Sequence, residues 1–234
     1  MIERTVMGPT TPAKAWQEMV EGNERFVAGE PRHPRQDVDR RSKLVQQFPH
    51  AALFGCSDSR LAAEIIFDMG LGDLFVIRNA GQVISDSVLG SLEYAVELLH
   101  VPLIVVLGHD ECGAVAAAVQ LSQPDPPSLP PHIRQLVDRI TPAVTRVRGQ
   151  LEEGAAIDPL EVGREHLRET VADMLTGSEL ISAAVAAGTL AIVGANYRLL
   201  EGMVVPDVVV GDIQTPTPTP ELIEAELIKG SAAP

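Results

Sequence analysis

The sequence predicts a single α/β domain: a mostly parallel central sheet of four to five strands flanked by helices, with an N-terminal helical arm. Apolar runs of strand character alternate with helical segments along the chain, as βαβ units require. Although 45% of the residues are apolar, only 3% are aromatic, so the core must consist of Val, Ile, Leu and Ala. This composition is typical of parallel strands covered on both faces. The 234 residues suffice for one such core.

The N-terminal arm, residues 1–44, is expected to contain one amphipathic helix. Thr11 followed by Pro12 has the form of a helix cap with proline at the first helical position, and Gly29 ends the pattern. Apolar residues recur at helical spacing between them: Trp16, Met19, Val20, Phe26 and Val27. Their face must pack either on another part of the chain or on a second subunit, and the sequence leaves both open.

The α/β domain is expected at residues 45–214. In its first half we predict strands at 51–55, 74–77 and 101–107 and helices at 62–69, 86–100 and 114–121. Five prolines in 123–131 indicate a surface loop. In the second half we predict a helical stretch at 133–151 that breaks or kinks at Pro142, helices at 161–175 and 179–187, a buried strand at 190–193, and an edge strand at 203–210 interrupted by Pro206. Residues 215–234 form a tail, extended over its Thr-Pro alternation and then either briefly helical or disordered.

Charge and hydropathy exclude several classes of partner. A net charge of −14 and a pI near 4.8 argue against nucleic acid and against anionic membrane surfaces, because phosphate binding needs clustered Lys and Arg. No apolar run approaches the roughly 18 to 20 residues of a membrane span, and the N-terminus lacks a signal-peptide pattern. We therefore expect a cytoplasmic protein with a small substrate. In a reducing compartment its two cysteines serve more often as metal ligands or reactive thiols than as a disulfide.

Both cysteines lie where a predicted strand ends. Cys56 and Asp58 follow the first strand, and His109 and Cys112 follow the strand at 101–107. Carboxyl ends of parallel strands share one edge of the sheet, where ligands bind in open α/β folds. Two thiolates, an imidazole and a carboxylate suit tetrahedral zinc and suit hard cations poorly, so we predict one Zn2+ per subunit.

The pairing of Asp58 with Arg60 suggests an exchangeable position in this site. Arg60 falls on the same side of an extended segment and can make a bidentate pair with the Asp58 carboxylate. Asp58 then either binds the metal or is held off it by Arg60, which leaves the fourth position for water. Zinc acidifies such a water toward a pKa of about 7 or somewhat above, giving a hydroxide nucleophile.

Two other interpretations of the metal site remain open at this stage. One is a structural zinc site, although a carboxylate ligand is unusual in such sites. The other is a noncatalytic zinc or thiol sensor in which Cys56 and Cys112 respond to oxidation. A sensor has no need of Asp58, Arg60 or Gln47.

Four stretches of the chain resemble the β-class carbonic anhydrases of bacterial type. They are Cys-Ser-Asp-Ser-Arg at 56–60, Arg-Asn-Ala-Gly at 78–81, Gly-Ser-Leu-Glu-Tyr-Ala at 90–95 and Gly-His-Asp-Glu-Cys-Gly at 108–113. The resemblance implies reversible hydration of carbon dioxide by zinc-bound hydroxide. It implies that Cys56, His109 and Cys112 are permanent ligands and that Asp58 and Arg60 form the dyad that governs access.

The resemblance also implies substrate-binding residues and an assembly. Gln47 would donate a hydrogen bond to substrate, Phe75, Ala80 and Tyr94 would line a small apolar pocket, and the Gly113 amide would lie beside it. Members of the family are homodimers, often assembled into tetramers, in which several of these residues reach the metal from the neighbouring subunit and the N-terminal helix wraps over the partner. Hydrolysis of carbonyl sulfide or carbon disulfide by the same site is a close alternative.

The remaining titratable residues carry weaker expectations. The other histidines, His33, His50, His100, His132 and His166, lack ligand spacing and are interpreted as surface or packing residues. Asp110 and Glu111 are interpreted as partners of a helix dipole, because carboxylates are common in the first turn of a helix.

Overall fold

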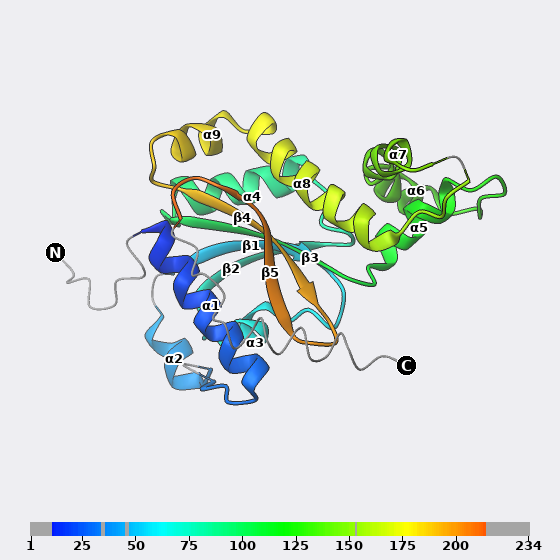
Figure 1. Ribbon diagram of the computed structural model, residues 1–234. Coiled ribbons are helices and arrows are strands. Elements are labelled where there is room, and N and C mark those ends of the chain that lie inside the picture. Colours follow the sequence, from blue (N-terminus) through cyan, green and yellow to red (C-terminus); the bar gives the residue numbers. More distant parts are fainter. Residues whose placement is uncertain (1–10, 34–35, 45–46, 153, 214–234) are drawn as a thin grey trace.

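The computed structural model describes residues 11–33, 36–44, 47–152 and 154–213, which form one five-stranded sheet in the order β2-β1-β3-β4-β5. The strands β2 (Leu74–Asn79), β1 (Ala51–Cys56), β3 (Leu103–His109) and β4 (Ala191–Arg198) are parallel. The last strand, β5 (Met203–Val210), pairs antiparallel with β4 at the edge (Figure 1). The predicted fold class and edge strand are confirmed, but Pro206 does not interrupt the strand: it pairs with Ala195, and the ladder shifts register between Gly194 and Ala195.

Alternate residues of the central strands point into two separate cores. Leu53, Val105 and Leu107 belong to the core beneath α1 (Pro12–Ala28) and α3 (Ala63–Ile66). Phe54 and Val106 point the other way, into the core covered by α4 (Asp86–Glu97), α8 (Pro159–Gly177) and α9 (Glu179–Ala186) (Figure 1). The short helix α2 (Val38–Lys43) follows α1. The sheet is thus covered on both faces, as its aliphatic composition predicts.

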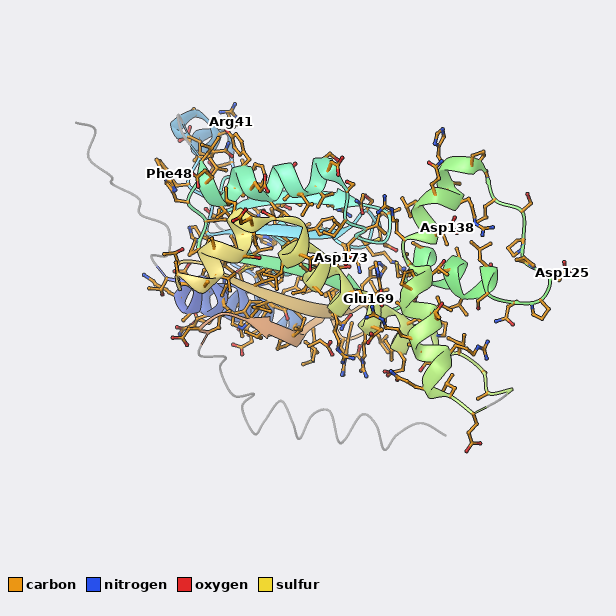
Figure 2. All side chains as sticks on the ribbon, turned by 90° about the horizontal axis from the view of Figure 1, so that it is seen from above. Arg41, Phe48, Asp125, Asp138, Glu169 and Asp173 are labelled. Carbon is orange, nitrogen blue, oxygen red and sulfur yellow. The ribbon has the colours of Figure 1, made fainter. Side chains whose placement is uncertain are left out.

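Three helices form a group beyond the carboxyl ends of the parallel strands: α5 (Gly113–Leu121), α6 (Pro131–Asp138) and α7 (Thr141–Gln150). Figure 2, in which Asp125 and Asp138 mark this group, shows it extending to one side of the sheet. Pro142 lies in the first turn of α7, so the predicted helical stretch is broken there into two helices.

Helix α1 begins and ends where its sequence predicts. The Thr11 side chain accepts a hydrogen bond from the Lys14 amide at 3.3 Å, and Gly29 closes the helix at φ +71°. Trp16 and Met19 are buried in the core of the same chain. Asn23 donates to the Ile66 and Gly202 carbonyls and accepts from the Val204 amide. One face of this helix therefore packs on its own chain.

Two predicted helices are shorter than expected. The helix predicted at 62–69 is limited to Ala63–Ile66, because Asp68 at φ +44° turns its carboxylate to the Arg32 and His33 amides. The helix α4 ends at Glu97, three residues before the predicted end, and His100 reverses the chain at φ +54°. None of the described helices combines the length and hydropathy of a transmembrane segment. The predicted tail, residues 215–234, lies outside the described residues.

Candidate metal centre

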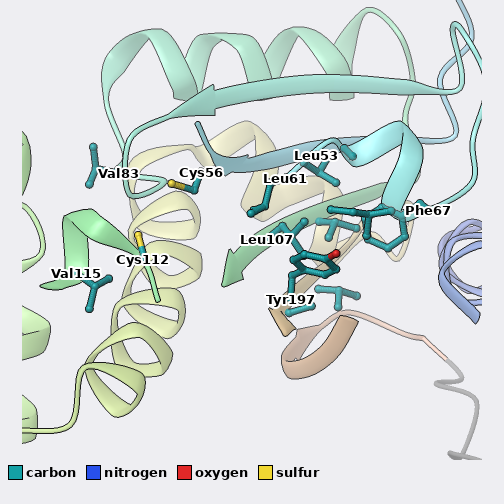
Figure 3. Packing of buried hydrophobic residues seen from close by; sticks show 14 of the residues in the cluster. Leu53, Cys56, Leu61, Phe67, Val83, Leu107, Cys112, Val115 and Tyr197 are labelled. Atoms are coloured by element: carbon teal, nitrogen blue, oxygen red, sulfur yellow. The ribbon is translucent and has the colours of Figure 1, made fainter. Parts of the chain in front are cut away.

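The three nitrogen and sulfur ligands predicted from the sequence meet at one edge of the sheet. Cys56 ends β1, His109 ends the neighbouring strand β3, and Cys112 immediately precedes α5. Their ligand atoms all lie within 4.8 Å of one another, and all three residues are buried. Figure 3 shows the two cysteine side chains reaching the same region from β1 and from the start of α5. Parallel pairing of β1 and β3 produces this convergence.

The hydrogen bonds of His109 prepare one ring nitrogen for a metal ion. Its Nδ1 lies 2.7 Å from the Asp110 carbonyl oxygen, which can only accept, so Nδ1 carries the proton. Its Nε2 is buried without a hydrogen-bond partner in the described part of the chain. A buried, unpaired nitrogen beside two thiols is costly unless it binds something. The donor set and this bare nitrogen both fit zinc.

The two thiols differ strongly in acidity. The Cys112 thiol, His109 and the amides of Gly81 and Asp58 lower the pKa of Cys56 to about 4, against the opposing effect of burial. The hydrogen bond to Cys56 and burial raise the pKa of Cys112. The mutual hydrogen bond of the two thiols lowers the pKa of Cys56 and raises that of Cys112, so a cation must displace a proton from this pair of thiols.

Asp58 is paired with Arg60 as the sequence suggests. Arg60 donates from Nε to Oδ1 at 3.0 Å and from Nη2 to Oδ2 at 2.9 Å, and its backbone amide also donates to Oδ1 at 2.9 Å. These bonds hold the pKa of the Asp58 carboxyl well below its usual range. The carboxylate is not among the clustered ligand groups.

Both carboxylates interpreted as helix-dipole partners make other contacts. Glu111 accepts from Arg60 Nη1 at 3.1 Å and is largely exposed. The Asp110 side chain accepts from the Leu199 amide at 3.0 Å, so it ties the loop after β3 to the end of β4. The sequence could not predict these roles, because Arg60 and Leu199 are far away along the chain.

The end of β2 and the loop after it contribute three hydrogen bonds whose roles the sequence analysis did not predict. Arg78 donates to the Cys56 carbonyl at 2.9 Å and to the Asp58 carbonyl at 2.6 Å. The Gly81 amide donates to the Cys56 sulfur at 3.3 Å. The available signal was the stretch at 78–81, which follows a strand adjacent to β1.

Only some of the residues expected to line the pocket lie beside the triad within one chain: Ala80 precedes Gly81, whose amide donates to Cys56, and Gly113 follows Cys112. Phe75 and Tyr94 stack with ring centroids 6.0 Å apart, and Phe75 packs against a different core cluster from the one that contains Cys56. Gln47, Ala80 and Gly113 are exposed.

Comparison with known proteins adds independent information. A family model described as carbonic anhydrase matches residues 51–204. Carbonic anhydrase 2 of Mycobacterium tuberculosis is 52% identical over 201 residues, which cover 85% of this chain and 94% of its own length. The carbonic anhydrase of Mycolicibacterium smegmatis is 49% identical over 209 residues, covering 88% and 98%.

Solved structures have the same fold. The β-carbonic anhydrase CcaA superposes with a TM-score of 0.63 at 26% identity, over 84% of this chain and 99% of its own. A structure from the study of two tetrameric β-carbonic anhydrases of Sordaria macrospora reaches a TM-score of 0.66 at 20% identity, over 85% and 100%.

Proposed function

Since the chain belongs to the β-class carbonic anhydrases and so catalyses the hydration of carbon dioxide, we propose that Asp58 and Arg60 control access to its metal. The observation that carries the proposal is the bidentate pair between the two side chains beside the Cys56–His109–Cys112 triad. This triad is typical of the zinc site of the family.

The donor atoms of the triad identify which residues would hold the metal. Sγ of Cys56, Sγ of Cys112 and Nε2 of His109 would hold zinc, with Nδ1 of His109 fixed by the Asp110 carbonyl. Bound zinc supplies a Lewis acid that brings the pKa of a water ligand toward about 7, so that it can attack carbon dioxide. A reducing compartment such as the cytoplasm would keep both thiols available for the metal.

Asp58 acts as a latch in this proposal. While Arg60 holds both carboxylate oxygens, the fourth position of a bound metal would be left to water and substrate. A carboxylate released from Arg60 would be free to close that position. Hydroxide competes better for zinc as pH rises, so we expect Asp58 on the metal at lower pH and on Arg60 at higher pH.

We further propose that a second copy of the chain completes the substrate pocket. Phe75 packs against a different core cluster from that of Cys56 and stacks on Tyr94, which is 44% exposed, so the pair is free to line the site of a neighbouring subunit. Ala80, Gly113 and Gln47 would complete it, with Gln47 donating to a substrate oxygen. This arrangement requires a homodimer. The Sordaria relatives are described as tetramers, so the proposal includes the assembly of two dimers into a tetramer.

Stopped-flow hydration of carbon dioxide by the zinc-loaded protein, followed from about pH 6.5 to 9, tests the proposal. We expect activity that rises steeply with pH in the wild type. Asp58→Asn should lower kcat/KM on the order of 10- to 100-fold with zinc still bound.

Glu111→Gln is the matched control, because Glu111 is a second carboxylate that pairs with Arg60. Activity that is high and flat with pH would discard the latch but keep the enzyme. No activity at any pH, with zinc bound, would overturn the carbon dioxide hydratase and direct the assay to carbonyl sulfide or carbon disulfide.

A further inference from the structure

We propose that His166, on α8, is a positioning residue of the metal centre. It holds the carbonyl of Gly81 so that the amide of Gly81 donates to the Cys56 sulfur. The inference rests on Cys56 being a metal ligand. It gives a role to a histidine that the sequence analysis interprets as a surface or packing residue.

The contact chain consists of two hydrogen bonds. His166 Nε2 lies 2.7 Å from the Gly81 carbonyl oxygen, and the Gly81 amide lies 3.3 Å from Cys56 Sγ. A carbonyl oxygen only accepts, so Nε2 carries a proton and donates it. Because His166 is only 4% exposed, no water competes for this bond.

Gly81 needs such a tie because its own backbone is the most pliable in the loop. It adopts φ +78°, and an added Cβ would lie 2.8 Å from the Ala114 Cβ and 3.0 Å from the Ile140 Cδ1. Only glycine fits there, yet glycine does not restrict its own rotation. The Gly81 amide belongs to the Ala80–Gly81 peptide unit, which lies between Asn79 at the end of β2 and the Gly81 carbonyl. Fixing this carbonyl from outside holds the far end of that short segment and so limits how far the amide can move from the sulfur.

The rest of the loop is already restrained at its two ends. The Asn79 side chain donates to the Val83 carbonyl at 2.8 Å and accepts from the Val83 amide at 2.9 Å. The Gly81 carbonyl lies between these anchors and is bound from a different layer of the molecule, 85 residues further along the chain. His166 thus controls the one part of the loop that reaches the metal ligand.

The His166 ring is held by the packing of α8 and carries no charge. His166 lies on α8 between the buried residues Val162 and Leu167, one in each core. Burial lowers the pKa of His166, so the ring is neutral near pH 7. Its influence on Cys56 is therefore geometric and not that of a nearby positive charge.

An N–H donor to a thiolate ligand withdraws charge from the sulfur and fixes its direction. Removal of partners of metal ligands typically costs 10- to 100-fold in metal affinity or activity. We expect a loss of that size, measured as faster release of zinc to a chelator, when His166 no longer donates.

The test uses the full chain with three substitutions. His166→Leu removes the donor and keeps a similar volume. His166→Gln replaces it with an amide N–H that reaches the same carbonyl. Val171→Ala, a buried position on the same helix that belongs to a different core cluster from Cys56, is the matched control for lost stability.

The decisive readout is the scalar coupling between the Gly81 amide proton and the metal in protein loaded with cadmium-113, which exists only through the hydrogen bond to the metal-bound sulfur. We expect this coupling in the wild type, His166→Gln and Val171→Ala, and its loss in His166→Leu. Zinc release should be about 10- to 100-fold faster in His166→Leu alone.

Persistence of the coupling and of wild-type zinc release in His166→Leu would overturn the proposal, as would absence of the coupling in metal-loaded wild type. Should His166→Leu not fold, His166→Asn, whose amide is one methylene shorter, replaces it with the same expected loss. Failure of the wild type to bind metal or hydrate carbon dioxide would instead refute the proposed function.

Discussion

Truncation of Trp16 tests whether α1 belongs to the core of its own chain. Trp16 is 1% exposed and packs in the core shared with β1 and β3, next to Met19 at 0%. Replacing a fully buried Trp by Ala removes its transfer free energy and leaves a cavity, which costs about 3–5 kcal/mol. We expect Trp16→Ala to lower the free energy of unfolding by that amount.

The assay is urea unfolding followed by circular dichroism, at several protein concentrations and with identical zinc loading. Since the contacts of α1 lie within one chain, the difference between variant and wild type should be the same at every concentration. Gln17→Ala is the control, because Gln17 lies on the exposed side of the same helix and pairs only with Glu21 among the described residues. It should cost less than about 1 kcal/mol.

Two results would refute this reasoning. A loss below about 1 kcal/mol for Trp16→Ala would mean that the side chain is not buried in solution. A loss that grows on dilution would mean that α1 is anchored on a partner subunit, as the resemblance to the family implies.

Three further predictions concern the supports of the metal centre and of α1. Asp68→Asn should cost roughly 2–3 kcal/mol at pH 7, because the carboxylate accepts from Arg25 and two amides. Those bonds lower the pKa of Asp68, so the difference from wild type in urea unfolding should be full above about pH 4 and vanish as pH falls through the folded-state pKa. Gly81→Ala should cost about 2–4 kcal/mol and speed zinc release, because Ala is strained at φ +78° and its Cβ meets Ala114; unchanged unfolding would contradict this. Glu111→Gln should change kcat/KM less than about twofold, since its pair with Arg60 is exposed, and a tenfold loss would make Glu111 part of the latch.

The sequence predicts the metal ligands well because their signal is local. Cys56 and His109 each follow a continuous apolar run, and runs of that kind become adjacent parallel strands whose ends meet. The ends of α1 and α9 were predictable for the same reason, since Thr11 and Ser178 cap helices with their own side chains. The break between α6 and α7 was predictable in the same way, because the effect of Pro142 on a helix depends only on its neighbours in the sequence.

What the sequence does not reveal depends on contacts between distant segments. The helix predicted at 62–69 ends early because Asp68 binds amides more than 30 residues before it. His166 carries no spacing signal, because its partner is a backbone carbonyl and any residue type presents one. Phe75 packs against a different core cluster from the one that contains Cys56, and it stacks on Tyr94 of α4, a contact between distant segments that the sequence alone left unspecified.

The position of the triad follows from the order of the strands. In the order β2-β1-β3-β4 the chain adds strands first on one side of β1 and then on the other, so the direction of winding reverses between β1 and β3. A crevice forms outside the carboxyl ends of the strands at such a point. Cys56 and His109 end the two strands that flank it. The fold therefore supplies the opening, whereas the loop after β2 and α8 supply the contacts that direct the ligands. Substitutions at Gly81 or His166 should accordingly change metal retention more than they change the fold.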